Sequence, residues 1–102
     1  MIQHVVLFAF GSHPDGMTKQ EFLTSVKNSF EELSGLIQPL QEISVSININ
    51  PNEEYDLMLR GILERYEDVE VYAEHPEHVS RVQRWIKPYV SKRACIDGSL
   101  LL

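Results

Sequence analysis

The chain opens with the apolar run Ile2-Gln3-His4-Val5-Val6-Leu7-Phe8-Ala9-Phe10. In a strand, successive side chains point to opposite faces. One face therefore carries His4, Val6, Phe8 and Phe10. The other face carries Val5, Leu7 and Ala9, which are also apolar. A strand that is apolar on both faces needs cover on both sides. The fold must therefore bury both faces of the sheet around this strand.

A helix is predicted to follow the turn residues 13–16. Thr18 is its N-cap, and Glu21 completes a capping box three residues later. Gly35 suits the left-handed conformation that commonly ends a helix. Four apolar residues recur at helical spacing and form the buried stripe: Phe22, Val26, Phe30 and Leu33.

Three further strands are predicted in the rest of the chain. Residues 42–48 alternate strictly between polar and apolar side chains, as a half-buried strand does. The polar connection 50–54 is short enough for an antiparallel hairpin to a strand over residues 55–63. The last strand is expected over residues 93–97.

A broken helix is predicted before the last strand. Its first part covers about residues 66–74 and must end or kink there, because Pro76 disfavours helical geometry at His75 and has no amide hydrogen to donate. Pro76 itself suits the first turn of a new helix. The residues expected on one face of that new helix are His78, Val82, Trp85 and Tyr89.

The predicted order is strand, helix, strand, strand, broken helix, strand. This split β-α-β arrangement is a ferredoxin-like α+β fold, with a four-stranded antiparallel sheet and both helical regions on one face. No helix is left to cover the opposite face, although the first strand is apolar there too. We therefore expect residues 1–102 to form a single domain that pairs through its bare face into a homodimer.

The composition narrows the classes of partner and compartment. With 9 Lys and Arg against 15 Asp and Glu, the formal net charge is −6, which argues against nucleic acid and anionic membranes as partners. No P-loop or dinucleotide glycine fingerprint is present, so no cofactor is expected. The only cysteine, Cys95, is expected to be a small core residue in a reducing, cytoplasmic protein.

The segment Tyr72-Ala73-Glu74-His75-Pro76-Glu77-His78 concentrates groups that exchange protons near neutral pH. If the site is catalytic, His78 is the general base that removes a proton beside a carbonyl, and Tyr72 donates a hydrogen bond to the developing enolate. The structural alternative is that both are interior groups with a satisfied hydrogen bond. His75 is expected to be a helix-boundary residue. No metal site is expected from His75 and His78, because no second ligand cluster accompanies them.

A pocket between sheet and helices is expected to enclose this site and to hold an alkyl or aromatic ligand. His4 can project into the same space, or it can be a structural hydrogen-bonding partner. The aromatic wall residues can likewise be ordinary core. The ligand-binding residues predicted from these patterns are His4, Val6, Phe8, Phe22, Val26 and Trp85.

The opening strand, the block from Tyr72 to His78 and the strand order together resemble the stress-responsive A/B barrel domain family. The resemblance extends over nearly the whole chain and implies a dimeric α/β barrel built from two ferredoxin-like halves. The family includes olivetolic acid cyclase-like proteins, which close a polyketide ring by aldol condensation. Their catalytic tyrosine and histidine correspond to Tyr72 and His78, and a first-strand histidine corresponds to His4. A third-strand pocket histidine is replaced here by Leu57. The resemblance therefore implies that Leu57 is a ligand-binding residue, and the replacement argues against the same substrate.

Two functions therefore stay open. The first is a stress-associated homodimer that binds a hydrophobic small molecule without chemistry of its own. The second is a cofactor-independent enzyme that acts on a hydrophobic carbonyl compound, as a cyclase, a lyase-like enzyme or a monooxygenase-like enzyme. Architecture does not choose between them, because function depends on the site.

Overall fold

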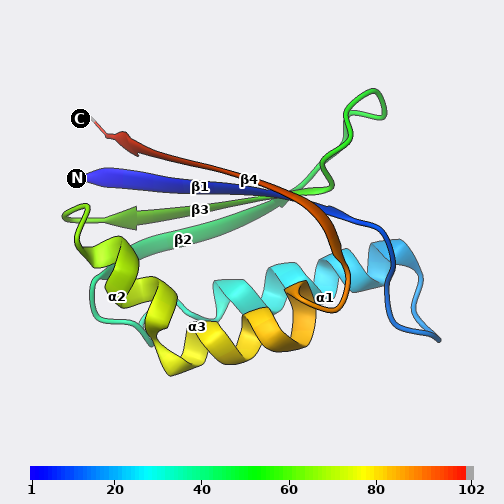
Figure 1. Ribbon diagram of the computed structural model, residues 1–102, viewed down its shortest axis with the longest axis horizontal. Helices are drawn as coiled ribbons and strands as arrows, with labels where there is room; N and C mark the ends of the chain where they lie inside the picture. The colour runs from blue at the N-terminus through cyan, green and yellow to red at the C-terminus, as the bar shows by residue number, and fades with distance from the viewer. Residues whose placement is uncertain (101–102) are drawn as a thin grey trace.

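Four antiparallel strands form one sheet, and the helices lie on one of its faces (Figure 1). The computed structural model describes residues 1–100. Along the chain the elements are β1 (Ile2–Phe10), α1 (Lys19–Glu31), β2 (Leu40–Ile47), β3 (Leu57–Leu63), α2 (Asp68–Glu74), α3 (Pro76–Arg81), the π-helical turn η1 (Val82–Ile86) and β4 (Val90–Ser99). The predicted ferredoxin-like α+β fold with a four-stranded antiparallel sheet is confirmed.

The first strand lies inside the sheet, in the order β2-β3-β1-β4. It pairs with β3 on one side and with β4 on the other, so His4 lies opposite Gly61 and Asp97. Directly paired residues of an antiparallel sheet point to the same face. The polar side chains of β1 and β4 at this level therefore lie together on the face that carries the helices.

Helix α1 begins with the predicted capping box. The Thr18 hydroxyl accepts a hydrogen bond from the Glu21 amide (3.1 Å), and the Glu21 carboxylate accepts one from the Thr18 amide (2.8 Å). Gly35 has φ +82°, the left-handed geometry expected after the helix. The buried stripe of the helix consists of Phe22, Leu23, Val26 and Phe30.

Pro76 divides the second helical region as predicted. His75 is extended (φ −63°, ψ 134°), α2 ends before it and α3 begins with the proline. The His75 ring caps α3, because its Nδ1 accepts a hydrogen bond from the Glu77 amide (3.1 Å). His75 is thus a helix-boundary residue. No helix within residues 1–100 combines the length and the apolar character needed to cross a membrane.

The helix after Pro76 is not a regular α-helix throughout. In η1 the Lys87 amide donates to the carbonyl of Val82 (2.9 Å), which is the wider hydrogen-bonding pattern of a π-helix. The extra residue in this turn rotates the side chains that follow it. Ile86 is consequently buried, whereas Trp85 is only half-buried and packs against Phe22.

The ends of several elements differ from the expected residues. β4 runs over Val90–Ser99 and not over 93–97, because it pairs along the whole of β1. β3 begins at Leu57 and not at residue 55, and the carboxylate of Asp56, just before it, accepts a hydrogen bond from the Phe10 amide (2.8 Å). These differences change no pairing of the predicted sheet.

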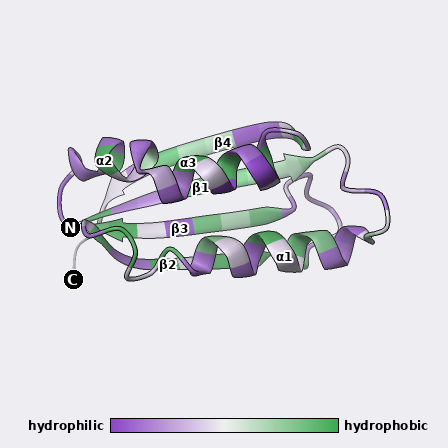
Figure 2. Cartoon of the chain, turned by 90° about the horizontal axis from the view of Figure 1, so that it is seen from below, coloured by the Kyte–Doolittle hydropathy of each residue, from purple (hydrophilic) through white to green (hydrophobic). Residues whose placement is uncertain are grey.

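The other face of the sheet carries no helix of the described chain. Figure 2, seen from the helix side, shows α1 along β2 and β3, with α2 and α3 over the β1 and β4 side. On the uncovered face Met58 pairs with Leu7, and Ile96 pairs with Val5. Met58 is 37% exposed and Ile96 is 71% exposed. The bare apolar face expected from the sequence is therefore present.

Candidate functional site

A cavity of about 440 Å³ lies between the sheet and the region α2-α3-η1. Its volume is within the range usual for small-molecule pockets. Apolar side chains form most of the wall, including Val6 and Phe8 from β1 and Ile86 from η1. The polar or ionisable side chains that line it come from β1, α2, α3, the end of η1 and β4: His4, Tyr72, His78, Lys87, Arg93, Cys95 and Asp97.

Tyr72 is the most deeply placed of these polar side chains. It extends from α2 and is only 1% exposed, and its hydroxyl has no hydrogen-bonding partner within residues 1–100. Burial raises the pKa of the phenol far above its ordinary value, so the hydroxyl keeps its proton. A buried hydroxyl without a partner carries a free-energy penalty that a bound acceptor atom would remove.

His78 lies beside Tyr72, with the two ring centroids 4.4 Å apart. Its Nδ1 donates to the carbonyl of Ala73 (2.9 Å), because a carbonyl can only accept. Burial lowers the pKa of His78, the hydrogen bond to Ala73 opposes this, and the charges of His4 and Arg93 lower the pKa further. The imidazole is therefore neutral at pH 7 and carries its lone pair on Nε2, as a general base requires.

His4 approaches the same tyrosine from the sheet. Its ring makes an edge contact with Tyr72 at a centroid distance of 5.8 Å. Its Nδ1 lies 2.5 Å from the carboxylate of Asp97, its partner on β4, and donates a hydrogen bond to it. A carboxylate in this position orients an imidazole and leaves Nε2 available. The cavity thus brings two oriented imidazoles and one phenol together.

Cys95 is exposed, which corrects the expectation that it is a core residue. It lies on the edge strand β4, where it lines the cavity and is still exposed to solvent. Burial of the sulfur and the charge of Asp97 raise the pKa of its thiol. His4, Cys95 and Asp97 offer donor atoms within 4.8 Å of one another and could hold a divalent ion such as Zn²⁺, although the carboxylate binds the imidazole in this structure.

Nine site residues were predicted, and the structure brings five of them to the cavity: His4, Val6, Phe8, Tyr72 and His78. The other four, Phe22, Val26, Leu57 and Trp85, do not line it. Phe22, Val26 and Leu57 are at most 2% exposed in the core, where α1 packs on the sheet. Trp85 is turned onto Phe22 by the π-helical turn.

Sequence reasoning did not anticipate Arg93, Cys95 and Asp97 as lining residues. A signal was available, because these residues alternate along β4 and each pairs with a predicted lining residue of β1. Arg93 pairs with Phe8, Cys95 with Val6 and Asp97 with His4. Lys87 carried no comparable signal, since its position depends on the π-helical turn.

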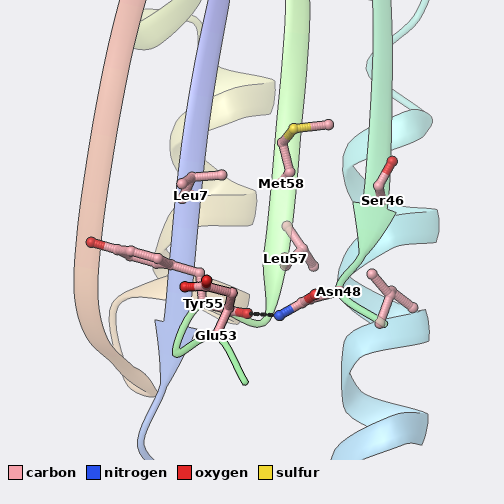
Figure 3. A pocket seen from close by; sticks show the side chains of 8 residues that line it. Leu7, Ser46, Asn48, Glu53, Tyr55, Leu57 and Met58 are labelled. Atoms are coloured by element: carbon pink, nitrogen blue, oxygen red, sulfur yellow. Dashed lines mark hydrogen bonds between the residues drawn. The ribbon is translucent and has the colours of Figure 1, made fainter. Parts of the chain in front are cut away.

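A second, shallower pocket of about 250 Å³ lies on the uncovered face of the sheet. Figure 3 shows Leu7 and Met58 on the sheet, with Tyr55 and Asn48 below them at the β2–β3 connection. The side-chain amide of Asn48 donates to the carbonyl of Tyr55 (2.6 Å) and ties the two ends of this connection together. Among residues 1–100, no histidine lines this pocket.

A comparison with protein-family models identifies one family over nearly the whole chain. A family model described as Stress responsive A/B Barrel Domain matches residues 2–100. A dimeric protein of unknown function with a ferredoxin-like fold from Bacteroides fragilis is 31% identical with a TM-score of 0.77, and the match covers 97% of this chain and 95% of that one. No curated protein sequence matches the chain.

Two further solved structures are similar in fold. A Dabb family protein from Mesorhizobium loti is 23% identical with a TM-score of 0.72, and the match covers 98% of this chain and 96% of that one. A protein from Arabidopsis thaliana is 21% identical with a TM-score of 0.79, with coverage of 100% and 97%. At these identities the likeness concerns the fold alone.

Proposed function

Because the chain belongs to the stress responsive A/B barrel domain family, we propose that it is a homodimer in which each protomer binds a hydrophobic small molecule between its sheet and its helices. The observation that carries the proposal is the cavity of about 440 Å³, whose apolar walls converge on Tyr72, His78 and His4. Small-molecule sites have this composition, with mostly apolar walls and a few placed polar groups. The single cysteine suits the reducing cytoplasm, where we expect the protein to act.

Two observations support the homodimer. The uncovered sheet face exposes Met58 and Ile96, and Met58 lines the pocket drawn in Figure 3. Pairing of two such faces would remove these side chains from water, which is the main favourable term in protein association. The similar protein from Bacteroides fragilis is itself dimeric.

A large side chain introduced on helix α2 tests whether the cavity binds a small molecule. Ala73 lines the cavity, whereas Val71 lies two residues away, is 52% exposed and does not line it. We expect the neutral fluorescent probe N-phenylnaphthylamine to bind the wild-type protein, and Ala73→Trp to weaken binding by roughly 10-fold or more, because the indole occupies ligand volume. Val71→Trp is the matched control and is expected to bind as wild type. Equal binding by both variants would place the probe elsewhere and contradict the proposal.

A second candidate function is a cofactor-independent enzyme acting on a hydrophobic carbonyl compound. The specific observation in its favour is the neutral His78 beside the Tyr72 hydroxyl, which has no hydrogen-bonding partner in the described part of the chain. In such a reaction Nε2 of His78 would take a proton from the carbon beside the carbonyl. The electron pair of that C–H bond would move into the enolate, whose oxygen accepts a hydrogen bond from Tyr72. This chemistry serves a cyclase or a lyase-like enzyme equally.

Solvent exchange of the proton beside the carbonyl gives a direct test of this second function. Aliphatic and aryl ketones are incubated with the protein in D₂O and deuterium incorporation is followed by NMR. We expect incorporation with the wild type, and a loss of roughly 100-fold or more in His78→Ala. The exposed His13 lies outside the cavity, so His13→Ala is the control and is expected to exchange like wild type. Exchange that persists in His78→Ala would remove this histidine as the base.

A further inference from the structure

Two cations line the cavity without a counter-ion among residues 1–100. The chain has nine Lys and Arg residues, and the six that form ion pairs are Lys19, Lys27, Arg60, Arg65, Arg81 and Lys92. Arg84 is placed over the ring of Trp85, 4.7 Å from its centroid. The two that remain, Lys87 and Arg93, both line the cavity. In a chain with a net charge of −6, two of the three Lys and Arg residues that have no counter-ion among residues 1–100 therefore line this one cavity.

Arg93 lines the same cavity as His78 and Tyr72, the residues of the proposed reaction. Arg93 pairs with Phe8 across the sheet, on the face that carries the helices. Burial is the main cause of the lowered pKa of His78, and the positive charge of Arg93 lowers that pKa further. Within residues 1–100, Asp97 is the only carboxylate side chain that lines the cavity, and it already accepts a hydrogen bond from His4. A ligand in the cavity therefore meets apolar walls and two solvent-exposed cations that have no counter-ion among residues 1–100.

From this arrangement, and resting on the binding function proposed above, we propose that the ligand is an amphipathic anion with an apolar body and a carboxylate head. The guanidinium of Arg93 presents a planar fork that matches a carboxylate, and Lys87 adds a second point charge. The apolar body would lie against Val6, Phe8 and Ile86, which line the cavity. A medium-chain fatty acid and an aryl-alkanoic acid both have this chemistry.

Two ligands that share an apolar chain and differ only in the head group separate the contribution of Arg93 and Lys87 from that of the apolar cavity walls. Decanoate and decanol, each below its aggregation limit, are titrated into the full protein by calorimetry and by NMR. We expect the wild type to bind decanoate roughly 10-fold or more tightly than decanol. We expect Arg93→Gln combined with Lys87→Gln to remove that preference while leaving the affinity for decanol unchanged. Arg84→Gln is the matched control, since Arg84 does not line the cavity, and it is expected to keep the preference.

The ring of His78 reports where the head group binds. Decanoate near Arg93 offsets the positive field on His78, so its pKa is expected to rise on decanoate binding and to stay unchanged with decanol. Equal affinity for the two ligands in the wild type would overturn the inference while leaving the binding cavity intact. A preference lost equally in Arg84→Gln would overturn it as well, because the attraction would then be nonspecific. Binding of neither ligand would overturn both the inference and the proposed binding function.

Discussion

His4 and Asp97 lie directly opposite each other on β1 and β4, and the carboxylate accepts a hydrogen bond from the imidazole Nδ1 at 2.5 Å. His78 has the same arrangement with a different acceptor, since its Nδ1 donates to the carbonyl of Ala73. Both imidazoles therefore keep Nε2 available to a ligand when neutral. The ring of Tyr72 contacts both of them, so the two histidines belong to one site.

Removal of the Asp97 carboxylate is expected to destabilise the protein. His4 is 7% exposed, so Asp97→Ala leaves a buried ring N–H without its acceptor, at a cost of about 1–2 kcal/mol in the free energy of unfolding. Urea denaturation measures this change. Glu54→Ala is the control, because it removes only the exposed ion pair with Lys92 and is expected to show no resolvable effect. Equal stability of Asp97→Ala and wild type would show that the His4–Asp97 contact contributes nothing to folding.

Tyr72→Phe is expected to leave the free energy of unfolding unchanged or to raise it by up to about 1 kcal/mol, because the lost hydroxyl is buried without a partner among residues 1–100. The same variant is expected to bind ligands that carry an acceptor oxygen more weakly. Thermal unfolding and calorimetric titration measure the two effects. In the control Tyr66→Phe the hydroxyl belongs to a side chain that is 65% exposed, and neither quantity should change. Clear destabilisation by Tyr72→Phe would mean that the hydroxyl is satisfied in the folded protein.

Stability is expected to fall in mild acid through His78. Burial lowers its pKa in the folded protein, whereas the unfolded chain titrates near the ordinary value of about 6.5. Between these two pKa values the unfolded state binds more protons, so the free energy of unfolding decreases as pH falls from about 6.5 through the folded pKa. His78→Gln should lack this decrease, whereas the exposed His13→Gln should retain it. Urea unfolding at pH 7.5 and pH 5.5 compares them, and an identical slope in His78→Gln would contradict the assignment.

A charged residue introduced on the uncovered sheet face is expected to dissociate the homodimer into monomers. Met58→Asp places a carboxylate where the apolar faces would meet, and burial of an unpaired charge is costly. We expect sedimentation velocity to show a dimer for the wild type at micromolar concentration and a monomer for Met58→Asp. Val71→Asp changes an exposed residue of α2 on the other side of the molecule and should leave the dimer intact. A monomeric wild type would exclude the proposed assembly.

The fold was predictable because its signals are local. The apolar run at residues 2–10, the capping box of Thr18 and Glu21, and the helix break at Pro76 each depend on a few neighbouring residues, and each is present in the structure. The exact ends of β3 and β4 were not predictable in the same way. They depend on pairing with β1, which lies far away in the sequence.

The site was predictable only in part, for the same reason. Tyr72 and His78 are close in the sequence and are joined by the helix break, so their meeting follows from local geometry. Their meeting with His4, and the addition of Arg93 to the same cavity, require the pairing of β4 with β1. Trp85 shows the opposite case, because one π-helical turn moved a predicted lining residue onto the core.

Taken alone, the residues of this chain determined the order of its elements, the helix caps and the apolar character of both sheet faces, since periodicity and capping act within a few positions. Only the folded arrangement decided which side chains meet in the cavity. A cavity wall is built from segments up to about ninety residues apart, and small rotations of a helix or a strand edge determine which of their side chains face one another.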